Sequence, residues 1–209
     1  MYLALNGAVV FRVCAMSNDH EAASWFASDP TDALEIRRVL EGDENAYARL
    51  VTRYQDGIGA YMWRFTRDER QCRELVHDVF VEAYFSLGTY RGQAPFVHWL
   101  RRIATRVGYR YWKLQARERA RIQFSFDEKK VEFADPGVRE EARWQSELIH
   151  AALALLSPRD RVVLTLLYLE GMSTKEASDM LVWSHALVRV QAFRAKKKLR
   201  YKVEKLMGN

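Results

Sequence analysis

The sequence predicts an all-α protein made of two small helical domains joined by a flexible linker. Apolar residues recur at intervals of three and four residues over most of the chain, which is the spacing of an amphipathic helix. The first half shows no alternation of apolar and polar residues of the kind found in a half-buried strand. Residues 116–143 lose the helical spacing and contain Asp-Pro-Gly, so they are expected to link the two helical parts.

These observations divide the chain into four segments. We expect an N-terminal extension at residues 1–28, a helical domain at 29–115, the linker at 116–143 and a second helical domain at 144–209. The extension is apolar but lacks the basic start of a signal peptide. It is expected to be disordered or to lie upstream of a true start at Met16, and a short anchor or partner-binding segment is the alternative. The chain has no run of about 18 apolar residues, so no insertion into a membrane is expected.

The helices of the first domain can be placed from their caps and their apolar spacing. We expect helices at residues 31–41, 44–65, 68–87 and 96–111. Asp29 or Thr31 is expected to cap the first helix, Gly42 to end it, and Asp68 to cap the third. The glycines and the proline of residues 88–95 predict a loop before the last helix.

The second domain carries stronger start signals. We expect helices at residues 151–156, 158–170, 174–181 and 185–206. Ser157 precedes a proline at the first helical position, and Ser173 has a glutamate three residues later, which is the spacing of a capping box. Gly171 is expected to end the second of these helices, and Ser184 to cap the last.

Positive charge is concentrated in two blocks of an otherwise acidic chain. Residues 91–121 carry a net charge of +8 and residues 184–209 carry +7, so the rest of the chain carries −9 within a total of +6. Two separate basic blocks suit two contacts with a polyanion such as DNA. Ordinary solvated helix faces are the alternative for either block alone.

The cysteines and histidines indicate neither a disulfide framework nor a metal site. Cys14 and Cys72 are far apart, and Cys72 falls at an apolar position of a predicted helix, where a small core residue is expected. The five histidines show no metal-ligand spacing. We expect no metal and no cofactor, and the chain suits a reducing cytoplasm. No carboxylate cluster, nucleophile motif or phosphate-binding glycine loop indicates an enzyme such as a nuclease or hydrolase.

The C-terminal basic block follows the pattern of a helix-turn-helix. A helix at 174–181, a turn at Val182-Trp183 and a basic helix from Ser184 would place the second helix in the major groove of DNA. Its outward positions are expected to be His185, Leu187, Arg189, Gln191 and Arg194. An arginine can pair there with guanine and a glutamine with adenine, while residues 196–198 and 200 would meet phosphates. An ordinary helical hairpin is the alternative.

The other basic block is interleaved with aromatic residues. Trp99, Tyr109, Tyr111 and Trp112 lie among the arginines of residues 101–121. Aromatic rings beside basic residues suit single-stranded DNA, because an unstacked base can lie on a ring face. A plain core position is the alternative for Trp99.

Two stretches together resemble an extracytoplasmic-function (ECF) sigma factor of bacterial RNA polymerase, in the sigma-70 family. The motifs "ELVHDVFVEAY" and "PFVHWLRRIA" resemble region 2 of that family, and "LSPRDRVVLTLLYLEGMS" with the basic helix after it resembles region 4. They occur in the family's order, with a linker of suitable length between them, and cover roughly residues 33–206.

The resemblance implies a transcription initiation factor, with no chemistry of its own, that directs core polymerase to promoters. The residues implied to bind core polymerase, at the clamp helices of its β′ subunit, are Glu74, Leu75, Asp78, Val79 and Glu82. Those implied at the −10 element, where a base is flipped out, are Tyr90, Arg91, Phe96, His98, Arg101, Arg102, Arg106 and Arg110. Those implied at the −35 element are Ser184, His185, Leu187, Arg189, Gln191, Arg194 and Lys197. The implied partners are core polymerase, including its β flap, promoter DNA and, as a possibility in this family, an anti-sigma factor that wedges between the domains.

Three places depart from the family pattern. An acidic cluster usual before the region 2 motif is replaced by Gln71-Cys72-Arg73-Glu74, which suggests a shifted docking surface or, alternatively, a charge restored by phosphorylation of a residue such as Thr66. Val182 stands where a glycine is usual, so a left-handed turn there would be strained, and Trp183 is expected to fill the space between the two helices. Leu187 and Gln191 predict an unusual −35 preference. A helix-turn-helix regulator that acts without polymerase is the alternative function, but it leaves the first domain unexplained.

Overall fold

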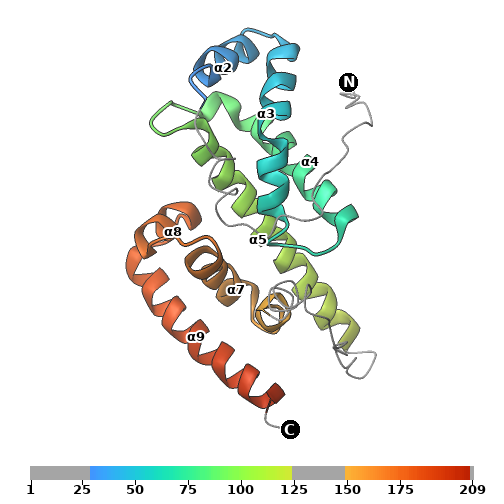
Figure 1. The fold of residues 1–209 in the computed structure, drawn as a ribbon, viewed down its shortest axis with the longest axis vertical. Coiled ribbons are helices and arrows are strands. Elements are labelled where there is room, and N and C mark those ends of the chain that lie inside the picture. Colours follow the sequence, from blue (N-terminus) through green and yellow to red (C-terminus); the bar gives the residue numbers. More distant parts are fainter. Residues whose placement is uncertain (1–28, 124–148, 208–209) are drawn as a thin grey trace, which may run out of the picture.

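The computed structural model describes residues 29–123 and 149–207, and the fold in Figure 1 is all helical over these residues. This confirms the predicted fold class. The predicted extension at 1–28 and most of the predicted linker lie outside the described residues.

The first domain consists of four α-helices and one short turn of 3₁₀-helix. These are α2 (Asp32–Leu40), α3 (Glu44–Met62), α4 (Glu69–Ser86), η1 (Leu87–Thr89) and α5 (Phe96–Gln123). The Asp68 side chain caps α4 by accepting a hydrogen bond from the Gln71 amide, as predicted, and Asp43 caps α3 in the same way. Thr31 precedes α2 without a capping hydrogen bond from its side chain. α5 is longer than predicted and extends past residue 116, where the linker was expected to begin.

The core of the first domain lies where α3, α4 and α5 meet. Phe65, which follows α3, is fully buried between Tyr61 and Trp112, whose ring centroids lie 5.8 and 4.6 Å from its own. The Trp112 indole donates a 2.7 Å hydrogen bond to the Phe65 carbonyl, and the Tyr61 hydroxyl lies 2.7 Å from that of Thr105. The buried polar groups of these aromatic residues are thus satisfied, which fixes the angle between α3 and α5. Cys72 is buried, as predicted.

The second domain consists of α7 (Pro158–Leu164), η2 (Thr165–Leu169), α8 (Thr174–Leu181) and α9 (His185–Met207). Ser157 caps α7 with Pro158 at its start, and Ser173 and Glu176 form the predicted capping box. The helix predicted at 158–170 changes to a π-helical turn at η2, and the helix before it ends at Ala154 instead of Leu156.

The turn between α8 and α9 contains the strain expected from its sequence. Val182 adopts φ 55° and ψ 42°, in the left-handed region, and is the one described residue other than glycine with a positive φ. A β-branched side chain in this region costs about 1–3 kcal/mol, whereas glycine adopts it freely.

We therefore expect Val182→Gly to stabilise the chain by about 1 kcal/mol. In thermal unfolding this corresponds to a rise in Tm of roughly 2–4 °C. Gly171→Ala is the matched control, because Gly171 has φ +61° with open space around it, and it should lower the Tm by a similar amount. A lower Tm for Val182→Gly would contradict the strain at this turn.

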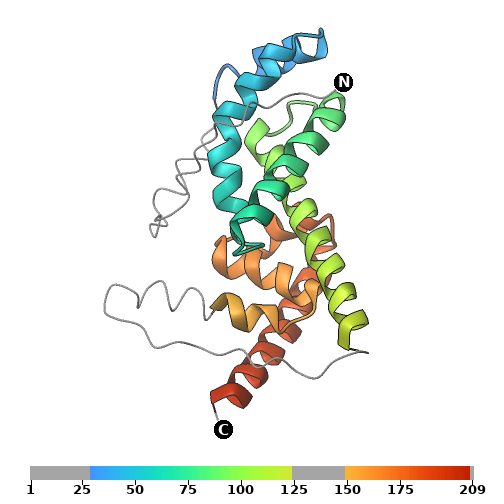
Figure 2. The ribbon, with the colours of Figure 1, turned by 90° about the vertical axis from the view of Figure 1, so that its right-hand side faces the viewer.

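The two domains pack directly against each other (Figure 2), an arrangement that the linker sequence did not predict. α5 contacts both α7 and α8. Six buried residues of the second domain belong to the same apolar cluster as the core of the first: Val162, Val163, Leu166, Ala177, Met180 and Val188. Most of the described core residues therefore belong to one cluster with α5 at its centre, and a separate small cluster in the second domain consists of Leu153, Leu156, Leu164 and Ala195.

Candidate nucleic-acid interface

The rotation of α9 is fixed by its first turn. The Ser184 hydroxyl accepts a hydrogen bond of 3.2 Å from the Leu187 amide, and His185 Nε2 lies 2.7 Å from the Thr174 hydroxyl on α8. Val188 is fully buried against α8. Five of the residues expected at the −35 element are exposed: Ser184, His185, Arg189, Arg194 and Lys197.

Gln191 does not point outward as expected. It is half-buried, and its amide nitrogen donates a hydrogen bond to the carboxylate of Asp160 on α7. Lys198 and Ser157 donate 2.7 and 2.8 Å hydrogen bonds to the same buried carboxylate. Burial raises the pKa of Asp160, but the hydrogen bonds, led by that from Lys198, outweigh burial and leave the pKa below its ordinary value. Gln191 therefore joins α9 to α7, and the expected pairing with adenine is not available in this arrangement.

Leu187 is also half-buried, whereas two apolar residues that the sequence analysis did not single out are exposed on α9. Phe193 is 75% exposed, and Val190 precedes it on the same face among the basic residues. Apolar side chains on a recognition helix can contact thymine methyl groups. Their exposure could have been predicted from the sequence, because both residues fall outside the apolar spacing that defines the buried side of α9.

The residues expected at the −10 element form an aromatic cluster at the start of α5. The rings of Phe96 and Trp99 stack with centroids 5.5 Å apart, and Tyr90 lies 5.6 Å from each. Phe96 is only 2% exposed, so it forms the floor of this cluster and does not present a free face to a base. Trp99 and Tyr90 are half-buried and Arg91 and His98 are exposed, so these four are the accessible members.

Three exposed arginines continue from this cluster along α5: Arg102, Arg106 and Arg110. Arg106 and Arg110 form ion pairs of 3.2 and 3.0 Å with Glu82 on α4. Because all three partners are substantially exposed, these pairs contribute little stability and can be exchanged for phosphate contacts.

Of the residues expected to bind polymerase, two are buried and the others are exposed or half-exposed. Leu75 and Val79 lie inside the first domain, so they hold α4 in place and cannot form its outer surface. Glu74 and Asp78 are exposed, and Glu82 is half-exposed. Phe85, which the sequence analysis missed, is 82% exposed on the same helix. Thr66 is buried and its hydroxyl accepts a hydrogen bond from the Asp68 amide, so this conformation does not present it for phosphorylation.

Arg101 differs from the other arginines of α5, because it contacts the second domain. Its guanidinium lies 2.8 Å from the carboxylate of Glu170, and Arg64 approaches the other oxygen at 3.0 Å. The Glu170 side chain is 9% exposed. Burial raises the pKa of Glu170, against the opposing effect of the two arginines. We call these three residues the Glu170 bridge.

Trp183 adds a second contact between the domains. Its ring lies edge-on to Tyr109 of α5 at 6.2 Å, and the guanidinium of Arg159, from its own domain, lies 4.9 Å from its centre. The prediction that Trp183 fills the space between the two helices therefore omitted its contact with Tyr109 of the first domain.

Comparison with known proteins supports the same division of the chain. Residues 50–118 match the family model of sigma-70 region 2, and residues 146–199 match that of sigma-70 region 4. The ECF RNA polymerase sigma-E factor of Haemophilus influenzae is 26% identical over 87% of this chain and 100% of its own length. The chain is an ECF sigma factor of the sigma-70 family. It is thus a transcription initiation factor and not an enzyme, and the region 2 match accounts for the first domain, which a simple helix-turn-helix regulator would not.

Other relatives and solved structures agree with this assignment. The RNA polymerase sigma-H factor of Pseudomonas aeruginosa is 27% identical over 77% of this sigma factor and 88% of its own length. The structure of CnrH in complex with the cytosolic domain of CnrY has a TM-score of 0.53 and 23% identity, and covers 84% of this chain and 98% of its own. The sigma factor RpoE of Bartonella quintana, solved with the anti-sigma factor NepR, has a TM-score of 0.51 and 17% identity, with 76% and 96% coverage. These two structures support the fold. Within the described residues of this sigma factor, no helix is long and apolar enough to cross a membrane.

Proposed function

We propose that this sigma factor binds core RNA polymerase in the cytoplasm and directs it to promoters by contacting a −10 and a −35 element. The observation that carries the proposal is the pair of exposed basic helix faces, one on α5 and one on α9, in separate domains. Two basic faces on one chain suit two separate contacts along the same DNA.

The N-terminal half of α9 is proposed to read the −35 element. Arg189 is the residue best placed for base recognition, because it is exposed one turn into the helix, where recognition helices meet base edges. Arg194 and Lys197 follow on the exposed surface and are proposed to contact phosphates, which position the helix without reading sequence. Phe193 is proposed to add an apolar contact.

The start of α5 is proposed to hold the −10 element. Tyr90 and Trp99 pack on the buried ring of Phe96, and they offer partly exposed aromatic faces to an unstacked base, with the exposed His98 nearby in the sequence. Stacking of a base on an aromatic ring is worth about 1–3 kcal/mol. Arg102, Arg106 and Arg110 are proposed to hold the nearby phosphates.

The exposed side of α4 is proposed to dock on the β′ clamp helices of core polymerase. Glu74, Asp78 and Glu82 supply negative charge there, and Phe85 supplies an apolar anchor of the type that dominates protein interfaces. The second domain is proposed to contact the β flap. An anti-sigma factor, as in the complex of the Bartonella quintana relative, is a further proposed partner.

Transcription by purified core polymerase, with and without this chain, tests the proposal on genomic promoter fragments. We expect initiation that depends on the chain and is lost with core polymerase alone. Arg189→Ala should weaken selective promoter use by about 1–3 kcal/mol, or roughly 5–150-fold, because one base contact is removed. Arg37→Ala, at an exposed position of α2, is the matched control. Binding of the chain to promoter DNA without any effect on initiation would instead support a regulator that acts without polymerase.

A further inference from the structure

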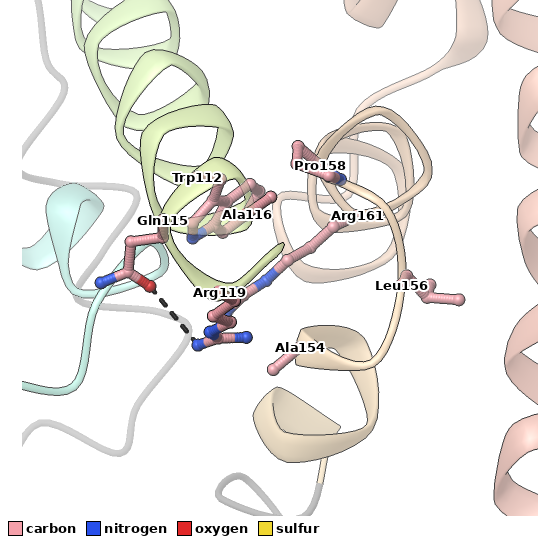
Figure 3. Close-up of a pocket in the computed structure, with 8 residues that line it drawn as sticks. All are labelled: Trp112, Gln115, Ala116, Arg119, Ala154, Leu156, Pro158 and Arg161. Atoms are coloured by element: carbon pink, nitrogen blue, oxygen red, sulfur yellow. Dashed lines mark hydrogen bonds between the residues drawn. The ribbon is translucent and has the colours of Figure 1, made fainter. Parts of the chain in front are cut away.

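A small cavity lies where the end of α5 meets the start of the second domain (Figure 3). Its volume is about 30 Å³, which is room for about two water molecules. Trp112, Gln115 and Arg119 line it from the first domain, and Pro158 and Arg161 line it from the second. Figure 3 shows the side chains of Arg119 and Arg161 converging on this space from the two domains.

Arg161 reaches the cavity without a negatively charged partner among the described residues. Its guanidinium carbon lies 4.0 Å from the centre of the Trp112 ring, which gives it one cation–π contact. Its Nε atom is buried and has no hydrogen-bond partner in the part of the chain that the structure describes. A buried guanidinium that is not neutralised is costly, and its unpaired N–H group adds the desolvation penalty of a polar group.

The surroundings of Arg161 add further positive charge. Burial, followed by the nearby charges of Arg119 and Arg67, lowers the pKa of Arg161 to about 10. The buried His150 is affected in the same way, and burial together with Arg67, Arg161 and Arg64 lowers its pKa to about 3. His150 is therefore neutral, and the positive potential here comes from guanidinium groups on both domains.

We propose that this cavity is a binding site for a small oxyanion of the phosphate class, held between Arg119 and Arg161. Guanidinium groups bind the oxygens of phosphate in pairs, and both Arg119 and Arg161 line this cavity. The exposed side chain of Arg119 can turn aside to admit a group larger than the present cavity. DNA phosphates do not suit the site, because it lies between packed domains and has no room for a duplex. Arg119 belongs to the first domain and Arg161 to the second, so the bound anion connects the two domains.

Thermal unfolding of the full chain in inorganic phosphate tests this site, with sodium chloride at the same ionic strength as the reference. We expect saturating phosphate to raise the Tm by roughly 5 °C more than chloride does, because a ligand stabilises the form that binds it. Arg119→Gln should reduce the apparent affinity for phosphate at least about tenfold, and this exposed substitution carries little risk to folding. Pyrophosphate and a nucleoside triphosphate, measured in parallel, distinguish free phosphate from a phosphorylated metabolite.

Arg161→Met gives a second, independent outcome. Without phosphate this variant should be at least as stable as the unmodified chain, since it removes an uncompensated buried charge and keeps the packing of the side-chain stem. In saturating phosphate the unmodified chain should be more stable than the variant, because only the unmodified chain binds the anion. Arg189→Gln, on the DNA-facing side of α9, is the control for general attraction of phosphate and should leave the effect intact. Equal effects of phosphate and chloride, or a phosphate effect that survives both Arg119→Gln and Arg161→Met, would overturn the proposal.

Discussion

Glu170→Gln is expected to separate the two domains while each remains folded. In the Glu170 bridge, one buried carboxylate neutralises Arg64 and Arg101 at 3.0 and 2.8 Å. Removing one partner of a buried ion pair costs about 3–5 kcal/mol when the other stays buried. Both arginines belong to the first domain and are partly exposed. When the two domains separate, the arginines return to water, and the cost of keeping an unpaired charge buried is avoided. The equilibrium between packed and separated domains should therefore shift by roughly 150-fold or more toward separation.

Small-angle scattering measures this shift as an increased radius of gyration, while far-UV circular dichroism should be unchanged. Glu41→Gln, at an exposed position after α2, is the matched control. Release of Arg101 should also strengthen binding of a −10 single strand, and the double variant Arg101→Gln with Glu170→Gln should lose that gain. An unchanged radius for Glu170→Gln would show that apolar packing alone holds the domains together.

Gly108→Ala is expected to destabilise the first domain strongly. A Cβ atom at Gly108 would lie 2.2 Å from Phe65 Cδ1, far inside the closest approach of real atoms. Phe65 cannot move aside, because Tyr61 and Trp112 pack against it and it is 2% exposed. Overpacking of this kind costs about 3 kcal/mol, at the upper end of the usual range. The Tm of the chain should fall by roughly 6–12 °C.

Gly88→Ala is the control for this substitution, because a Cβ atom there meets nothing within 4 Å. Combining Gly108→Ala with Phe65→Leu should recover part of the lost stability, since the smaller side chain makes room for the added methyl group. If Gly108→Ala unfolds at the same temperature as Gly88→Ala, α3 and α5 do not approach as closely as the structure indicates.

The helix starts could be predicted because their signals are local. The helix-capping side chains each accept a hydrogen bond from an amide three residues later, so the sequence alone contains both partners; they are those of Asp68, Ser157, Ser173 and Ser184. The end of α5 was missed for the opposite reason. Its last turns are charged and largely exposed, so they show no apolar spacing although they remain helical.

The errors at the candidate site come from contacts between distant residues. Gln191 was expected to point outward from its position in the helix, but its partner Asp160 lies 31 residues earlier in the chain. Leu75 and Val79 fitted both the apolar stripe of α4 and the docking surface implied by family resemblance, and their burial supports the first interpretation. The packing of the two domains could not be predicted, because a linker sequence does not specify which surfaces meet.

The carboxylate of Asp160 has a consequence for how promoter elements are spaced. It connects α7 to both Gln191 and Lys198 on α9, so the recognition helix cannot tilt independently of the domain that carries it. Tolerance for an extra or missing base pair between the two promoter elements must then come from rigid-body displacement of the whole C-terminal domain. We expect a change in the spacing of the promoter elements to move the second domain as a unit relative to α5.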